Sequence, residues 1–252
     1  MYKKSFSIYL NGIDKIINDI NNKRINSKGY VCAVNTHSFA MALYDNKVQK
    51  ALKNSFANVP DGVPISLYAS IESKRWIKRV YGPDLMKALI VKFNENSNKK
   101  IFFLGGDSKV VNSILIIMKD IYPQVIVAGF DTRIVKLRSN EDDLIQKINK
   151  AKPDVVFVGI GCPRQEIWMH NNSKKINSFL IGVGAAFDFF SGNKKQAPKI
   201  IQVLSLEWLY RLFQEPKRLF WRYVIHNSIF IAHCFLRFLY FIWNKIRGKL
   251  YA

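Results

Sequence analysis

The stretch PDVVFVGIGCPRQE, from Pro153 to Glu166, predicts a buried strand, a glycine turn and the start of a helix in direct succession. Val155 to Val158 contain no polar side chain, which is typical of a strand covered on both faces of a parallel sheet. Gly159 and Gly161 remove side chains where the strand ends, so another molecule can approach the backbone. A helix that begins near Pro163 would present free N–H groups to an anion. We therefore predict a ligand site at the carboxyl end of this strand, with an ordinary strand-to-helix turn as the alternative.

Other apolar runs repeat this pattern along the chain. Short, largely apolar segments that predict strands lie at 30–34, 100–104, 125–129 and 178–184, and the segment 7–22 predicts a strand followed by a short helix. Helices are expected at 39–52, 110–118, 141–149 and 200–213, and from residue 79 onward. The segment 56–64 holds two prolines and a glycine, which predict a fixed loop. Strands that alternate with helices predict an α/β fold, a Rossmann-like parallel sheet with helices on both faces.

Composition favours one large domain in a reducing compartment. The 252 residues are 49% hydrophobic, which is enough for a full core. Cys32, Cys162 and Cys234 are far apart and odd in number, so a disulfide framework is not expected. The first residues lack the apolar core of a signal peptide, and we expect the protein in the cytoplasm. We predict an α/β core over residues 1–194 and a helical appendage over residues 195–252.

The formal net charge is +21, from 39 basic and 18 acidic residues. Such a balance predicts a polyanionic surface as a partner, either nucleic acid or an anionic membrane. The region after Pro216 is the most informative, because it has seven basic residues, many aromatic ones and no acidic residue. We expect too many charges here for a membrane-spanning helix and predict an amphipathic stretch in the plane of the membrane surface. Packing onto the body of the protein or onto a second subunit is the alternative.

A few polar residues stand where chemistry is expected. Asp61 lies between Pro60 and Gly62, in a segment that would hold its carboxylate in a fixed position, although Asp-Gly is also a common turn pair. Thr36 follows the first strand of the sheet, as a ligand or as a helix cap. His37 follows Thr36, and the four histidines have no metal-ligand spacing. The glycine-rich dinucleotide motif, the Walker motif and the nucleophile-elbow motif are missing from the sequence.

Several longer motifs resemble the WecG/TagA/CpsF family of glycosyltransferases. They are NTHS at 35–38, PDGVP at 60–64, RVYGPDLM at 79–86, FLGG at 103–106, the stretch 153–166, GVGAAFD at 182–188, EWLYRL at 207–212 and QEP at 214–216. The resemblance runs in order from about residue 8 to residue 224. It implies transfer of a sugar from a UDP-sugar to a polyprenyl-diphosphate-linked sugar at the cytoplasmic face of the bacterial plasma membrane. It also implies a β linkage formed with inversion, no cofactor and no required metal.

The resemblance assigns roles to single residues. Asp61 falls on the catalytic base proposed for the family. The expected substrate-binding residues are Asn35, Thr36, Arg79, Gly105, Gly159, Gln165, Gly184 and Asp188. The residues expected to bind the lipid diphosphate are Arg211, Arg218 and Arg222. The transferred sugar is expected to be N-acetylmannosamine, its uronic acid or a related hexose, in the synthesis of a cell-surface polysaccharide or teichoic acid.

Physical reasoning adds a mechanism and leaves alternatives open. Inverting transfer needs a base for the acceptor hydroxyl, which we assign to Asp61, with His37 next. Without a metal, backbone N–H groups and arginines would meet the charge of the departing UDP, and the i, i+4 spacing of Arg218 and Arg222 places both on one helix face. The glycosyltransferase prediction includes no nucleic acid partner. A nucleic-acid-binding module and a non-catalytic membrane-surface protein remain as alternatives to it. The sequence does not decide whether the protein forms a homo-oligomer.

Overall fold

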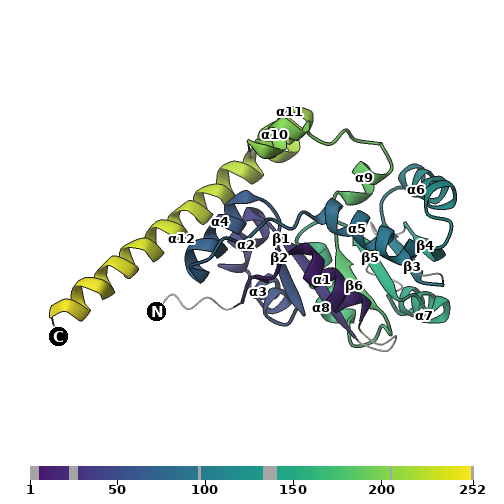
Figure 1. The fold of residues 1–252 in the computed structure, drawn as a ribbon, viewed down its shortest axis with the longest axis horizontal. Helices are drawn as coiled ribbons and strands as arrows, with labels where there is room; N and C mark the ends of the chain where they lie inside the picture. Colours follow the sequence, from purple (N-terminus) through teal and green to yellow (C-terminus); the bar gives the residue numbers. More distant parts are fainter. Residues whose placement is uncertain (1–5, 23–27, 96–97, 133–140, 205, 251–252) are drawn as a thin grey trace.

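Six parallel strands form one sheet with helices on both faces. The computed structural model describes residues 6–22, 28–95, 98–132, 141–204 and 206–250 (Figure 1). The strand order is β2-β1-β6-β5-β3-β4. In chain order the strands are β1 Gly29–Val34, β2 Ala57–Pro60, β3 Lys100–Gly105, β4 Ile126–Asp131, β5 Val155–Gly159 and β6 Phe179–Gly182. The predicted α/β fold with a parallel sheet is confirmed.

Alternation along the strands builds two core layers, one on each face of the sheet. In β5, Val156 and Val158 belong to one layer while Val155 and Phe157 belong to the other. The first layer is closed by α2 Thr36–Ala42, α3 Asn46–Lys53, α4 Val63–Ser73, α7 Glu141–Ala151 and α8 Arg164–Asn172. The second layer is closed by α1 Gly12–Asn21, α5 Gly82–Glu95, α6 Ser108–Ile121 and α9 Ala186–Phe190. All six strands are therefore held between two layers of helices.

The strand register brings the carboxyl ends of four neighbouring strands to one edge. Val34 of β1 lies opposite Pro60 of β2, and Gly182 of β6 lies opposite Cys32 of β1 and Val158 of β5. The residues that follow these strands come together above that edge, where open parallel sheets bind their ligands.

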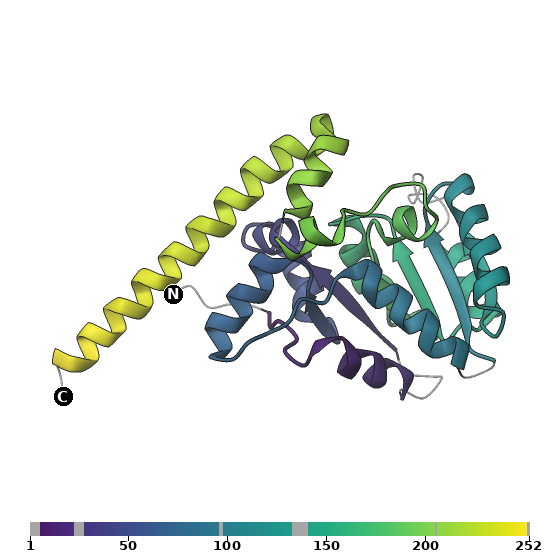
Figure 2. The ribbon, with the colours of Figure 1, turned by 45° about the horizontal axis from the view of Figure 1, so that its top comes forward.

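After α9 the described chain continues with α10 Lys199–Val203, α11 Glu207–Gln214 and α12 Pro216–Leu250. The 35 residues of α12 span about 52 Å at 1.5 Å per residue. The part of α12 up to Arg237 contacts the body at α2 and at Glu72 of α4, and the rest projects away from the body as a single rod (Figures 1 and 2). The predicted boundary at residue 194 therefore separates two segments that are in contact.

Some predicted elements differ from the observed ones. The predicted loop at 56–64 is wrong, because 57–60 form the edge strand β2 and α4 begins at Val63. The predicted helix 39–52 is two helices, because α2 ends at Ala42 and a new helix, α3, begins after Asp45. Asp45 caps α3, since its Oδ1 accepts from the Lys47 N–H at 2.8 Å. The helix predicted at 200–213 is likewise divided into α10 and α11. Residues 7–10 run beside β2 without forming a strand, with Tyr9 N donating to Asn58 O at 2.7 Å.

Candidate active site

Two adjoining cavities lie at the carboxyl edge of the sheet. The polar cavity has a volume of about 230 Å³, and its lining includes Gly159, Gly161, Gln165, Gly184, Asp188, Lys194 and Arg218. The apolar cavity has a volume of about 350 Å³, and its lining includes Val63, Pro64, Trp208, Leu219, Phe230 and Ile231. Both cavities are lined by Asn35, Asp61, Tyr81, Arg211 and Arg222, which form the wall between them. Molecules bound in the two cavities would therefore both contact this shared wall, which carries one carboxylate and two arginines.

Asp61 is fixed in this wall by its backbone and by its side chain. Its N–H donates to Val34 O at 2.8 Å, which continues the pairing of β1 and β2 by one residue. The Gly82 N–H donates to Asp61 Oδ1 at 3.3 Å. Burial raises the pKa of the Asp61 carboxyl above its ordinary value, while the Gly82 N–H and the charges of Arg211 and Arg79 lower it. A fixed carboxylate with a raised pKa is suited to accept a proton from a substrate hydroxyl.

Glycine turns open the polar cavity where β5 and β6 end. Gly161 and Gly184 have φ angles of 82° and 57°, and a Cβ at either position would have no neighbour within 4 Å. These two glycines are required by backbone conformation, and they leave open space. Gly159 has another reason to be glycine, because a Cβ there would lie 2.8 Å from the Phe187 ring. The N–H of Gly184 donates to Gln165 Oε1 at 3.2 Å, so it is already engaged.

Glu166 supports Gln165 from below the polar cavity. Gln165 is 2% exposed, and its Nε2 donates to Glu166 Oε1 at 3.0 Å. Glu166 is fully buried, and burial raises the pKa of its carboxyl, although the hydrogen bond from Gln165 lowers it. The amide of Gln165 is therefore held between the Gly184 N–H and the Glu166 carboxyl. Glu166 is a positioning residue that the sequence analysis did not single out.

Three arginines gather around the cavities from α11 and the first turns of α12. Arg211 and Arg222 lie in the shared wall, while Arg218 lines the polar cavity. Burial lowers the pKa of the Arg222 guanidinium, and the neighbouring charges of Arg211 and Arg218 lower it further. The Nε of Arg222 is buried and has no hydrogen-bond partner among the described residues. Cations that repel one another and a buried N–H without an acceptor are the features of a site for an anion.

The apolar cavity is also lined by polar side chains, among them Thr36, Arg79, Glu207 and Asn227. Thr36 Oγ1 donates to Asn227 Oδ1 at 2.8 Å, which joins α2 to α12. Arg79 pairs with Glu207 and lies over the Tyr81 ring, with 4.9 Å from its Cζ to the ring centroid. Burial and the nearby Arg222 charge lower the pKa of His37 to about 3, so this ring is neutral at physiological pH.

Within the described residues, no group of three or more His, Cys, Asp or Glu side chains is placed to hold a metal ion. Among the described residues that line the two cavities, the cationic side chains are Lys194, Arg79, Arg211, Arg218 and Arg222.

Comparison with known proteins distinguishes the glycosyltransferase from the alternative functions that the sequence left open. The sequence profile described as the Glycosyl transferase WecG/TagA/CpsF family matches residues 6–241. The chain belongs to this family. It is therefore a glycosyltransferase, as the resemblance implied.

Three relatives of this WecG/TagA/CpsF chain have the same name. A protein of Bacillus subtilis named N-acetylglucosaminyldiphosphoundecaprenol N-acetyl-beta-D-mannosaminyltransferase is 32% identical over 189 residues, which are 75% of this chain and 72% of the relative. A Bacillus spizizenii protein of the same name is 29% identical over 198 residues, 78% of this chain and 75% of the relative. A Staphylococcus aureus protein of that name is 32% identical over 142 residues, 56% of this chain and 54% of the relative.

The glycosyltransferase brings most of the predicted site residues to the two cavities. Gly159, Gln165, Gly184, Asp188 and Arg218 line the polar cavity, Thr36 and Arg79 line the apolar cavity, and Asn35, Asp61, Arg211 and Arg222 line both. Gly105 lies outside both linings, and a Cβ on it would be 2.7 Å from Gly159 O. Asn35 also caps α2, because its Oδ1 accepts from the Ser38 N–H at 3.1 Å. Tyr81, Lys194 and Glu207 are in the linings but were not predicted.

We predicted that the segment after Pro216 has too many charges for a membrane-spanning helix. This prediction is wrong as a statement about composition. Within the described residues, the segment Pro216–Asn244 is long and apolar enough to cross a membrane by length and composition. Arg237 is the single Lys, Arg, Asp or Glu between Tyr223 and Asn244. The segment nevertheless packs on the body of this glycosyltransferase, since Phe230 and His233 are buried and Arg237 Nη2 donates to Glu72 Oε2 at 2.6 Å. It cannot cross a membrane and keep these contacts.

Proposed function

We propose that this glycosyltransferase transfers an N-acetylmannosamine-type sugar from a UDP-sugar to a polyprenyl-diphosphate-linked sugar, with inversion at the anomeric carbon. N-acetylmannosamine, its uronic acid and a related hexose are the candidate sugars. The position of Asp61 carries the proposal, because this carboxylate stands in the wall between a polar cavity and an apolar one. The name shared by the relatives supports the acceptor class, a diphosphoundecaprenol that carries N-acetylglucosamine.

The donor nucleotide is assigned to the polar cavity. Its glycine turns allow close approach of a ligand to the backbone at the carboxyl ends of β5 and β6. Arg218 lines the polar cavity but not the apolar one, so we assign it to the donor. Arg211 and Arg222 line both cavities and face both ligands. The sequence analysis gave all three arginines to the lipid diphosphate, and the cavity linings lead us to divide them in this way.

The lipid-linked acceptor is assigned to the apolar cavity. Leu219, Phe230 and Ile231 of α12 give this cavity an aliphatic and aromatic wall that suits a polyprenyl chain. The same helix carries exposed apolar residues on the side turned away from the body: Trp221, Val224, Ile225, Phe235 and Leu239. A lipid could pass from a membrane along α12 into the cavity without exposing its chain to water.

In the proposed mechanism, Asp61 removes the proton of the acceptor hydroxyl while the oxygen attacks the anomeric carbon. The bond to UDP breaks on the opposite face, so the configuration inverts. The negative charge that grows on the UDP β-phosphate is met by Arg211, Arg218 and Arg222, which are already oriented around the cavities. Gln165, fixed by Glu166 and Gly184, lies against the donor.

The proposed location is the cytoplasmic face of the plasma membrane, with peripheral attachment. The docked half of α12 supports attachment in the plane of the surface, because Phe230 and Arg237 hold the helix to the body. Its exposed apolar stripe and the basic residues after Trp243 are the features of an interfacial helix.

The test is transfer by purified protein in detergent or vesicles. Lipid-diphosphate-linked N-acetylglucosamine is incubated with UDP-N-acetylmannosamine, its uronic acid and UDP-hexoses, UDP release is measured, and the anomeric configuration of the product is read by NMR. We expect acceptor-dependent UDP release and a β-linked product. A retained configuration would exclude the single-displacement mechanism, and no UDP release with any pair would favour the non-catalytic alternative.

A further inference from the structure

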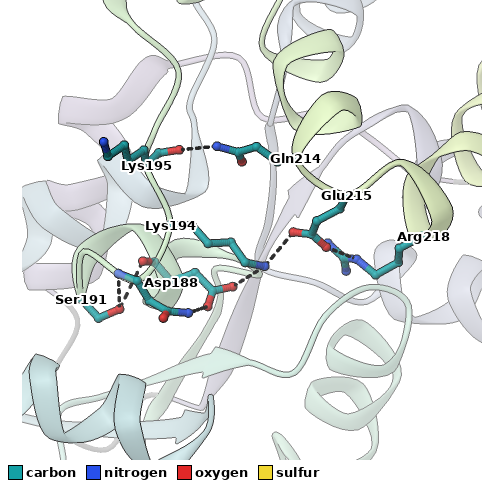
Figure 3. A network of polar contacts seen from close by, with 8 residues as sticks. Asp188, Ser191, Lys194, Lys195, Gln214, Glu215 and Arg218 are labelled. Carbon is teal, nitrogen blue, oxygen red and sulfur yellow. Dashed lines mark hydrogen bonds and ion pairs between the residues drawn. The ribbon is translucent and has the colours of Figure 1, made fainter.

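A chain of ion pairs lies at one side of the polar cavity, whose lining includes Asp188, Lys194 and Arg218. Lys194 Nζ lies 2.7 Å from Glu215 Oε1 and 3.3 Å from Asp188 Oδ2, and Arg218 Nε pairs with the other oxygen of Glu215 (Figure 3). Lys194 follows α9, whereas Glu215 and Arg218 belong to the junction of α11 and α12. The chain of ion pairs therefore links the body to the helix that brings the arginines.

The loop before Lys194 is ordered by Asp188. Asp188 O accepts from the Lys194 N–H at 3.0 Å, and Asp188 Oδ1 accepts from Asn193 Nδ2 at 3.1 Å. Both carboxylate oxygens of Asp188 are thus engaged within the protein, one by Asn193 and the other by Lys194. This residue was predicted to bind substrate, and its contacts are those of a residue that positions Lys194.

The two cations reach the cavity, but the glutamate between them does not. Lys194 and Arg218 are both in the cavity lining, and Glu215 is not. Burial alone would raise the pKa of the Glu215 carboxyl, but hydrogen bonds from Lys194 and Arg218 hold it below its ordinary value. Glu215 is therefore a charged internal anion that balances two cations at the edge of the polar cavity.

We infer that Lys194 and Arg218 bind the diphosphate of the donor, and that Glu215 pairs with both cations when no diphosphate is present. The inference rests on the proposed function for the presence of a nucleotide diphosphate, and it is independent of the sugar and the acceptor. A diphosphate carries more than one negative charge and offers several acceptor oxygens, so it outcompetes a single carboxylate for the two cations. The release of Glu215 would tie donor binding to the position of the α11–α12 junction.

The experiment measures binding of UDP, inorganic pyrophosphate and uridine by calorimetry to the full chain at low ionic strength. Lys194→Met should weaken UDP and pyrophosphate about tenfold, the effect of losing one charge-assisted contact, and leave uridine unchanged. Glu215→Gln should tighten UDP about threefold or more, because a competing charge is removed. In the double variant Lys194→Met/Glu215→Gln this gain should be reduced, since only Arg218 remains to be released.

Lys195→Met is the matched control for the lysine. Figure 3 shows the Lys195 side chain directed away from Lys194 and Glu215, so the control removes the same charge without touching the ion pairs. Glu95→Gln on α5, an exposed partner of Lys92, is the control for the glutamate. Thermal unfolding of each variant separates loss of binding from loss of folding.

Each other outcome has a defined meaning. Equal weakening by Lys194→Met and Lys195→Met would reduce the effect to net charge and overturn the inference, and so would weaker UDP binding by a folded Glu215→Gln variant. Binding of pyrophosphate without UDP would contradict the proposed donor and leave the inference to be decided by the pyrophosphate series. If the wild-type protein binds neither, the inference is wrong, while the transfer assay still decides the proposed function.

Discussion

At the scale of single residues, Asp61 keeps a carboxylate in surroundings that favour its neutral form. Burial raises the pKa of this carboxyl, so the folded state holds the proton more tightly than the unfolded state, where the pKa is about 3.9. Stability therefore falls as the pH rises from the unfolded pKa through the folded one, and at neutral pH the charged carboxylate destabilises the fold. This destabilisation is the cost of placing a carboxylate in the wall between the cavities.

Asp61→Asn is expected to lower turnover by about a hundredfold to ten-thousandfold, the usual contribution of a general base, while UDP binding is retained. The same variant should unfold at a higher temperature at neutral pH, by about 2–4 °C for each kcal/mol gained, since the amide keeps an acceptor for the Gly82 N–H. The measurements are single-turnover transfer and thermal unfolding. Asp120→Asn on the exposed face of α6 is the control. A near-normal rate would move the role of base to another group.

Two variants of Glu166 distinguish the contribution of its hydrogen bond to Gln165 from the contribution of its negative charge. The side chain is 0% exposed, and its pKa is raised by burial. Glu166→Gln keeps an acceptor for Gln165 and should stay within about 1 kcal/mol of the wild type. Glu166→Ala leaves the Gln165 amide unpaired and opens a cavity, with an expected loss of about 2–4 kcal/mol by urea unfolding. Equal losses in both variants would show that the charge itself is required.

At the scale of elements, α12 is both a wall of the candidate active site and a surface helix. Its first turns bring Arg218 and Arg222, and its middle is held by Phe230, whose ring centroid lies 5.2 Å from that of Phe39. Removing the contact at Phe230 should release the helix and withdraw the arginines from the cavities.

Phe230→Ala is expected to cost about 3–5 kcal/mol of helix docking, as for other buried phenylalanines. UDP binding should weaken, and proteases should cut α12 faster. Phe241→Ala, at a position 62% exposed on the same helix, is the matched control and should leave both properties unchanged. If Phe230→Ala binds UDP as the wild type does, the arginines of α12 do not serve the donor.

Strands with an uninterrupted apolar run were predictable, whereas a strand that depends on tertiary contacts was not. The run Val155 to Val158 predicts its strand because no polar side chain interrupts it. The strand β2 is four residues long and contains Asn58, a residue disfavoured in strands. Its Nδ2 is satisfied by Ser7 O at 2.9 Å and Leu52 O at 2.8 Å, contacts that no local pattern reveals.

The site divides in the same way. Gly159 and Gly184 follow apolar runs that mark strand ends, so the sequence could place them, whereas Asp61 was predicted in a loop and stands directly after the strand β2. Lys194 stands in the polar run NKKQ, which has the composition of a solvated loop. Its role depends on Glu215, 21 residues later in the chain, and only the packing of α11 and α12 brings the two together.

At the scale of the whole molecule, charge and apolar surface act together. A net charge of +21 attracts the protein to anionic lipid, but attraction alone gives no orientation. An exposed apolar stripe on α12 gives the protein an orientation, because it faces away from the body on the helix that lines the apolar cavity. The stripe consists of Trp221, Val224, Ile225, Phe235 and Leu239. The protein should therefore settle on a membrane with α12 in contact with lipid.

The double variant Val224→Glu/Phe235→Glu tests this orientation, since both side chains are exposed and neither lines a cavity. Burying two such side chains in lipid is worth about 1.5–3 kcal/mol each, so binding to phosphatidylglycerol vesicles should fall at least about tenfold. Transfer to a long-chain acceptor in vesicles should fall in parallel, while transfer to a short-chain, water-soluble acceptor should persist because both cavities are intact.

The matched control is Ile116→Glu/Ile121→Glu on α6, where both side chains are exposed, on the opposite side of the molecule from α12 (Figure 1). It makes the same change in net charge away from the stripe, so vesicle binding should fall only slightly at physiological salt. An equal loss in both double variants would mean that charge alone holds the protein to the membrane. Undiminished binding by the Val224→Glu/Phe235→Glu variant would place the contact with lipid elsewhere, and α12 would then act only as a wall of the active site.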